Sequence, residues 1–277
     1  MVQVSPDGTV ERLLPSGLTI HAVSTLDIEF LYREIFEQKI YEQHGISIVE
    51  GSTVMDCGAN IGLFSIYAAE AAGSSGQVLS VEPLEHIHAA LEENITSLLH
   101  HCISQGASCA LITACRAGVG DGSKDKMDFT LYPSFACWST MYPQDEEFHQ
   151  KHIAEYVYNN IAALAGMPPS LYNRAARFFF YITPSWIFNW SMRRYVRNNL
   201  LKTDTQRCAM TTVSALMAEH DLERIDLLKI DVEGAELDVL RGIRPEDWPR
   251  ISQASDFKLQ RSVCQDGSAS IRDAARA

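Results

Sequence analysis

Two short clusters of residues have the types and spacing that ligand chemistry needs. The first is Val54-Met-Asp56-Cys-Gly58-Ala-Asn60-Ile-Gly62, where an apolar run leads through glycines into a helix-like segment. Glycines at such a turn let the backbone approach a ligand closely. A pyrophosphate-binding turn would read G-x-G-x-x-G, whereas the acid at Asp56 would repel a phosphate. The cluster therefore favours a ligand with a positive charge or an amino-acid moiety.

The second cluster is Leu228-Lys-Ile-Asp231-Val-Glu233-Gly-Ala-Glu236. Carboxylates and a lysine crowded at the end of a strand perturb one another's proton affinity, as catalytic groups often do. The alternative is that Glu233 and Glu236 only stabilise a helix N-terminus. Between the clusters, Glu82 ends another apolar run, where an acid commonly accepts ribose hydroxyls.

The elements that must hold these residues alternate between short strands and helices. Such alternation predicts an α/β fold with an open, largely parallel sheet and helices on both faces. The carboxyl ends of the strands then meet at one edge, where these sheets bind ligands. We expect strands over 53–57, 77–81, 110–117, 127–132 and 225–230, and helices over 63–72, 84–100, 211–220 and 235–242.

An extension over residues 1–50 precedes the expected sheet domain of 51–250. The runs Thr9–Leu14 and Leu18–Val23 alternate around a Pro-Ser-Gly turn, which predicts a β-hairpin. Apolar residues from 31 to 41 then recur at helical spacing, and Gly45 is placed to end that helix.

Two further segments interrupt the pattern. Residues 143–203 predict a helical insert, whose part 170–203 holds six basic and nine aromatic side chains and no acid. This part is interpreted as a cap over the substrate or a docking site for an acidic carrier domain or membrane surface; the alternative is a subdomain whose aromatics pack inward. Residues 251–277 are polar and do not alternate, so we expect an atypical tail and an incomplete C-terminal edge of the sheet.

Composition narrows the class of protein. The 277 residues include 23 Lys and Arg against 35 Asp and Glu, a net charge of −12, which argues against nucleic-acid binding. No apolar stretch reaches the ~18 residues of a transmembrane helix, and we see no signal peptide. The seven cysteines form no CxxC pair, which is typical of reduced thiols, so we expect a cytoplasmic protein. Nothing demands a metal; the cluster over 146–152 is interpreted as a solvated helix face.

Together these stretches resemble the FkbM family of S-adenosylmethionine-dependent methyltransferases. The resemblance implies a Rossmann-like class I methyltransferase sheet with S-adenosyl-L-methionine as cofactor. It runs from about Leu14 to about Trp248 and rests on Phe30–Phe36, Val54–Ser65, Val81–Pro83 and Ile225–Ile243. By position it implies that Asp56, Gly58, Asn60 and Gly62 cradle the methionine part, that Glu82 holds the ribose, that Asp121 lies at the adenine region, and that Asp231 and Glu233 face the methyl group and the acceptor.

The activity that the resemblance implies is methylation of a hydroxyl group on a small-molecule acceptor. Asp231 is the candidate base for the hydroxyl proton. Two alternatives stay open. One is an oxidoreductase that uses the glycine turn for NAD. The other is a degenerate or truncated, non-catalytic S-adenosylmethionine-binding protein, because the chain departs from the family's pattern after Trp248.

Overall fold

The computed structural model describes residues 2–4, 10–23, 25–43, 45–132, 139–142, 194 and 203–255. The acid and histidine cluster at 146–152, nearly all of the aromatic and basic segment 170–203, and residues 256–277 lie outside the described residues. Among those described, no helix is long and apolar enough to cross a membrane.

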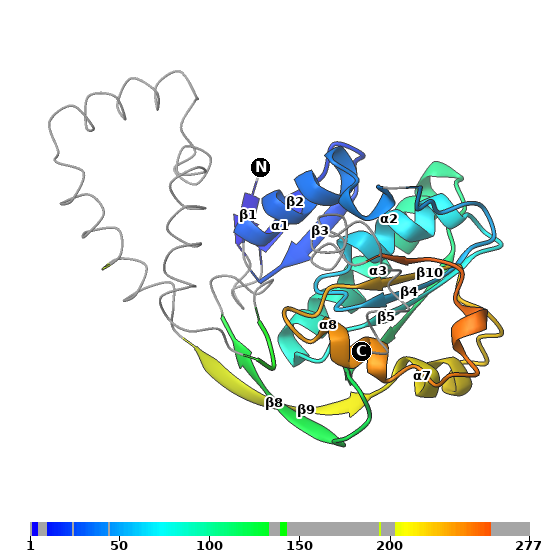
Figure 1. Cartoon of the computed structure of the whole chain (residues 1–277). Helices are drawn as coiled ribbons and strands as arrows, with labels where there is room; N and C mark the ends of the chain where they lie inside the picture. Colours follow the sequence, from blue (N-terminus) through cyan, green and yellow to red (C-terminus); the bar gives the residue numbers. More distant parts are fainter. Residues whose placement is uncertain are drawn as a thin grey trace, which may run out of the picture.

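A five-stranded parallel sheet forms the centre of the molecule (Figure 1). Its strands lie in the order β11-β10-β4-β5-β6, and every neighbouring pair is parallel. The chain runs outward from β4 through β5 to β6, and then returns to build β10 and β11 on the other side of β4. The order therefore reverses between β4 and β10, which is where open α/β sheets form their ligand crevice. The strands are β4 (Thr53–Cys57), β5 (Gln77–Val81), β6 (Leu111–Cys115), β10 (Leu227–Ile230) and β11 (Ala254–Ser255).

Helices cover both faces of this sheet. Successive side chains of a strand point to opposite faces, and in β4 both sets include apolar side chains that are buried against helices. Val54 of β4 belongs to the apolar core shared with α2 (Leu63–Ala72) and α3 (Glu85–Gln105). Its neighbour Met55 belongs to a second core, shared with α7 (Val213–Glu219) and α8 (Glu236–Arg241). The α/β class predicted from the sequence, with helices on both faces, is confirmed.

The N-terminal extension begins with a small antiparallel sheet in the order β1-β2-β3. The expected hairpin is confirmed, because β2 (Val10–Leu13) pairs with β3 (Thr19–Ala22). The pairing of β1 (Val2–Val4) with β2 was not predicted.

A buried asparagine joins this hairpin to the sheet domain. The side chain of Asn94, in α3, has no exposed surface. Its Oδ1 accepts a hydrogen bond from the His21 amide at 2.7 Å, and its Nδ2 donates to the His21 carbonyl at 2.8 Å. Nδ2 also donates to the carbonyl of Ile61 at 2.7 Å, in the turn after β4. One side chain thus bridges β3, α3 and the glycine turn.

The helix expected to continue to Gly45 is wrong in its second half. α1 (Thr25–Tyr32) runs into a π-helical turn over Arg33–Glu37, and the chain then reverses at Lys39, whose φ is +48°. A separate short turn follows over Ile40–Glu42. Tertiary contacts hold this turn: the Glu42 carboxylate accepts from the hydroxyl of Tyr67 in α2 and from the Ile48 amide. The spacing of apolar residues reports only local periodicity, so it could not predict these contacts.

A second, smaller sheet in the order β7-β9-β8 borders the central one, and β8 and β9 form the long curved ribbon at the bottom of Figure 1. It consists of β7 (Gly118–Val119), β8 (Lys126–Leu131) and β9 (Asp204–Thr211). Strand β9 was not predicted, because residues 204–210 had no assigned element between the insert and the expected helix over 211–220. That strand is mostly exposed or half-buried, and therefore lacks the apolar alternation of a buried strand.

The first five residues of the expected atypical tail, 251–255, contribute to the central sheet, where no strand was predicted. Ile251 pairs with Ile225, and Ala254 and Ser255 of β11 pair in parallel with Leu228 and Lys229 of β10. Such pairing uses backbone groups, so small and polar side chains do not prevent it.

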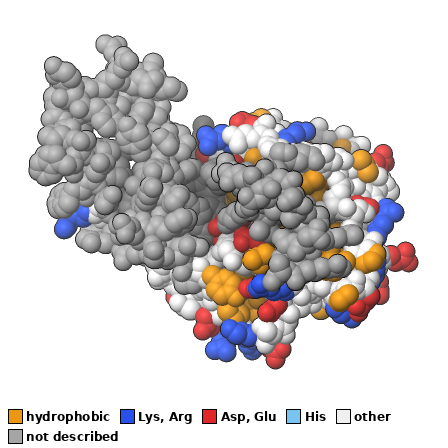
Figure 2. All heavy atoms as spheres, in the orientation of Figure 1, with side chains coloured by type: hydrophobic (Ala, Val, Ile, Leu, Met, Phe, Trp, Pro, Cys, Tyr) orange, Lys and Arg blue, Asp and Glu red, His pale blue; other side chains and the backbone are white. Residues whose placement is uncertain are grey.

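The described surface on the face shown in Figure 2 carries acidic and basic side chains interspersed with one another. On this face the negative net charge of the chain is therefore not gathered into one patch of the described residues.

Candidate active site

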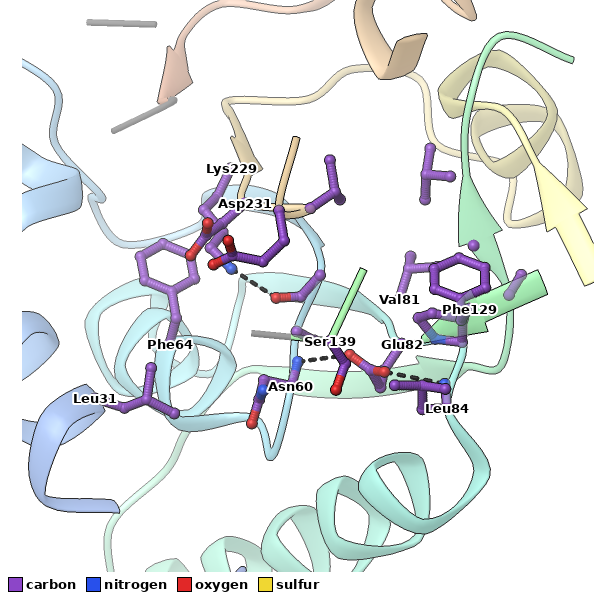
Figure 3. Close-up of a pocket in the computed structure, with 18 of the residues that line it drawn as sticks. Leu31, Asn60, Phe64, Val81, Glu82, Leu84, Phe129, Ser139, Lys229 and Asp231 are labelled. Carbon is purple, nitrogen blue, oxygen red and sulfur yellow. Dashed lines mark hydrogen bonds between the residues drawn. The ribbon is translucent and has the colours of Figure 1, made fainter. Parts of the chain in front are cut away.

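A cavity of about 760 Å³, counting its part open to solvent, lies at the carboxyl edge of the central sheet. Figure 3 shows Asp231 and Phe64 at one end of the cavity, and Glu82 toward the other end, where Phe129 also lies. The lining includes the residues that directly follow three strands: Gly58 after β4, Glu82 after β5 and Asp231 after β10.

In the glycine turn, the backbone of Gly58 lies very close to the backbone of Asp231. Gly58 has φ +77°, and a Cβ there would lie 2.0 Å from the carbonyl oxygen of Asp231, so only glycine fits between β4 and β10. Asn60 also lines the cavity, with φ +51° and its Oδ1 accepting from the Ile61 amide. Gly62 faces the other way, since a Cβ there would meet Leu91 of α3 at 2.4 Å. Gly62 therefore serves helix packing and does not line the cavity.

Asp56 lies beneath the turn and not in the cavity lining. Its carboxylate is fully buried, accepts from the Ser65 hydroxyl at 2.7 Å, and forms an ion pair with the Lys229 ammonium at 2.8 Å. Lys229 also donates to the carbonyl of Gly58 at 2.8 Å. Burial acts to lower the pKa of Lys229, but the charges of Asp56 and Asp231 outweigh it and raise that pKa above its usual value. The pair thus fixes the turn from below as an ion pair.

Glu82 presents a buried carboxylate to the cavity. One oxygen accepts from the Leu84 amide and the other from the Asn60 amide, both at 3.0 Å (dashed in Figure 3). Burial raises the pKa of Glu82 to about 7, although both amides and Lys229 act to lower it. Each carboxylate oxygen has a second lone pair, so Glu82 retains the capacity to accept two more hydrogen bonds.

Asp231 is held by a residue of the N-terminal extension. The Tyr41 hydroxyl donates to Asp231 Oδ2 at 2.7 Å, and the Tyr41 ring packs edge-on against Phe64 at 5.0 Å between centroids. Burial, with the charge of Asp231 added, raises the pKa of Tyr41 well above its usual value, so its phenol stays a donor. Tyr41 was not predicted as a site residue, because it lies 190 positions before Asp231 in the sequence.

The other acids of the second cluster divide between the two expected roles. Glu233 lines the cavity, with φ +53° and its carbonyl accepting from the Thr140 hydroxyl. Glu236 does not line the cavity; its carboxylate turns back to accept from the Gly234 amide at 2.9 Å. The helix-terminus interpretation thus describes Glu236, and the site interpretation fits the position of Glu233.

Asp121 lies outside this cavity, in a neighbouring hollow with Tyr142 and Asp238. It is exposed, and hydrogen bonds from Ser123 lower its pKa. The structure therefore brings together Gly58, Asn60, Glu82, Asp231 and Glu233, and places Asp56, Gly62 and Asp121 outside the lining.

Comparison with protein families identifies the class of this sheet domain. The model of the methyltransferase FkbM domain family matches residues 56–261, most of the chain. The chain belongs to the FkbM methyltransferase family. The predicted family and the methyltransferase class are thereby confirmed, and the NAD-dependent alternative is set aside. The match begins at Asp56, so the extension with Tyr41 precedes it.

FkbM relatives come from bacteria and fungi. The 31-O-demethyl-FK506 methyltransferase FkbM of Streptomyces tacrolimicus is 30% identical over 253 residues, covering 88% of this chain and 80% of that protein. Methyltransferase sdnD of Sordaria araneosa is 27% identical over 248 residues, covering 87% and 78%. The AMB antimetabolite synthetase AmbE of Pseudomonas aeruginosa is 28% identical over 251 residues, 91% of this chain, which spans only 10% of that synthetase.

Proposed function

We propose that this FkbM domain transfers the methyl group of S-adenosylmethionine to a hydroxyl oxygen of a small-molecule acceptor. The observation that carries the proposal is the placement of two carboxylates, Glu82 and Asp231, at separate points of one cavity across the reversal of strand order. One acid suits the ribose of the cofactor, and the other suits the reacting groups.

The residues of the cavity fit S-adenosylmethionine. Glu82 has two unused lone pairs for the ribose hydroxyls, and Gly58 and Asn60 line the same cavity. Since Lys229 is paired with Asp56, the carboxylate of Asp231 adds a negative charge at that end of the cavity. Such a site attracts a sulfonium cation. When bound, S-adenosylmethionine supplies a methyl carbon that an acceptor oxygen attacks as the carbon–sulfur bond breaks, leaving S-adenosylhomocysteine.

The chain's own contribution to this reaction is position and proton transfer. The fixed turn at Gly58 and the carboxylate of Glu82 would orient the cofactor, so that the methyl carbon faces Asp231 in line with the acceptor. Asp231 would take the proton of the acceptor hydroxyl as the new carbon–oxygen bond forms. Glu233, on the same segment, would contact the acceptor.

The relatives support the class of acceptor. The Streptomyces tacrolimicus protein is named as a methyltransferase of 31-O-demethyl-FK506, and AmbE is named as an antimetabolite synthetase. A small molecule is therefore the class of acceptor that we propose. Delivery by an acidic carrier domain or from a membrane surface, through residues 170–203, stays a prediction from the sequence.

Calorimetric titration with S-adenosylmethionine and S-adenosylhomocysteine tests the cofactor, and mass spectrometry of candidate hydroxyl compounds incubated with S-adenosylmethionine tests the transfer. We expect binding of both ligands with one site per chain. Folded protein that binds neither would contradict the proposal.

The raised pKa of Glu82 predicts pH-dependent binding. Ribose hydroxyls donate to the ionised carboxylate, and with a pKa of about 7 this form is scarce at pH 6 and dominant at pH 8. Affinity for S-adenosylhomocysteine should therefore rise up to about tenfold from pH 6 to pH 8. The Glu82→Gln variant, which cannot ionise, should bind more weakly with a flat profile; an equal slope in both proteins would assign the titration to another group.

The same shift affects the unliganded protein in the opposite direction. The folded chain keeps the Glu82 proton at pH values where the unfolded chain has lost it, so stability falls as the pH rises from the usual value of 4.5 toward 7. Ligand should therefore stabilise the protein most at the upper end of this window.

A further inference from the structure

The N-terminal extension places a phenol inside the cavity. Tyr41 lies in the short turn Ile40–Glu42, upstream of the region that the family model matches, and it lines the cavity. Its hydroxyl donates to Asp231 Oδ2 at 2.7 Å. A hydrogen bond of about this length to an ionised carboxylate is among the stronger ones in proteins. The extension thus reaches the acid to which we assign the acceptor proton.

Contacts from several elements fix the phenol. The Tyr41 ring packs against Phe64 of α2, and the Lys229 ammonium of β10 lies 5.3 Å from the ring centroid. The Tyr41 carbonyl accepts from the hydroxyl of Ser255 in β11 at 3.1 Å. Only 4% of the residue is exposed. The hydroxyl is therefore held at one place relative to the sheet.

We propose that Tyr41 is a positioning residue of the methyl-transfer site, whose hydroxyl holds one oxygen of Asp231 so that the other faces the place where methyl group and acceptor meet. In the part of the chain that the structure describes, Tyr41 is the one side chain that donates to this carboxylate. The terminal torsion of an aspartate side chain has a broad energy minimum, so a carboxylate without such a contact rotates easily. A hydrogen bond to one oxygen limits this rotation and keeps the other oxygen aligned with the reacting groups. The inference rests on the proposed function, because it takes Asp231 as the acid beside the methyl group.

Two cofactor analogues test this role without knowledge of the acceptor. S-adenosylhomocysteine has no group at the methyl position, whereas sinefungin carries an amine there, which is protonated at neutral pH. A carboxylate held at that position favours sinefungin. We expect the wild-type protein to bind sinefungin more tightly in calorimetric titrations. The Tyr41→Phe variant should lose about fivefold of this preference while its affinity for S-adenosylhomocysteine stays unchanged, which also shows that the variant is folded.

A second tyrosine provides a matched control. The Tyr142 hydroxyl donates to Asp238 Oδ2, also at 2.7 Å, but this pair lies outside the cavity. Tyr142→Phe should leave the sinefungin preference at the wild-type value. In an Asp231→Asn background, Tyr41→Phe should have no further effect on the preference, because the two residues act as one unit.

Each outcome of the titrations decides between explanations. A wild-type protein without the preference, a Tyr41→Phe variant that keeps it, or an equal loss of affinity for both analogues would overturn the positioning role. A folded wild-type protein that does not bind S-adenosylhomocysteine would instead overturn the proposed function.

Discussion

Replacement of Lys229 by methionine is expected to lower the free energy of unfolding by about 3–5 kcal/mol. The ammonium of Lys229 is the charge that compensates Asp56, a fully buried residue of β4. Without it the carboxylate keeps only the Ser65 hydroxyl as its described hydrogen-bond donor. Urea denaturation at neutral pH measures the loss, which is a large fraction of the 5–15 kcal/mol typical of a domain.

The double variant Asp56→Asn/Lys229→Met separates charge from packing. Because it removes both charges, it should recover a large part of the lost stability. If the double variant were as unstable as Lys229→Met alone, the loss would come from the packing of the lysine stem and not from an uncompensated charge.

Substitution of Gly58 by alanine is the second large effect that we expect. The added Cβ would lie 2.0 Å from the carbonyl oxygen and 2.9 Å from the carbonyl carbon of Asp231, and the residue has φ +77°. Overpacking and left-handed strain together should cost about 2–5 kcal/mol. The clash can be relieved only if β4 and β10 separate at the cavity, so binding of S-adenosylhomocysteine should also be lost. Denaturation and calorimetric titration of the same variant measure the two effects.

Gly45 offers the control for the backbone contribution. It also has a positive φ, of +86°, but a Cβ there would meet nothing within 4 Å. Gly45→Ala should therefore cost only the left-handed strain, about 1–2 kcal/mol, and leave ligand binding intact. Equal losses from the two variants would show that the close approach at Asp231 is not the cause.

The strands and helices next to the glycine turn were predictable because each is decided by local pattern. Thr53–Cys57, Leu63–Ala72 and Gln77–Val81 have the bounds read from the sequence. Their apolar runs are bounded by glycine or by an acid and proline, which punctuate secondary structure strongly. The grouping of Gly58, Glu82 and Asp231 followed from the rule that parallel strands end at one edge.

The remaining features depend on partners distant in the sequence. β9 is an exposed strand defined by its pairing with β8, and β11 is defined by its pairing with β10. The place of Asp56 beneath the turn is decided by Lys229, and the turn that carries Tyr41 is held by Tyr67, Phe64 and Ser255. No window of neighbouring residues contains these pairs, so periodicity and motif spacing cannot report them.

The three hydrogen bonds of Asn94 have a consequence for how separable the extension is. If the chain were cut before the sheet domain, Asn94 would lose both of its partners at His21 while its amide stayed buried beside Ile61. Buried polar atoms without hydrogen-bond partners lower the free energy of unfolding, so the remaining sheet domain would be destabilised at the turn that lines its cavity. We therefore expect the hairpin and the sheet domain to open as one cooperative unit.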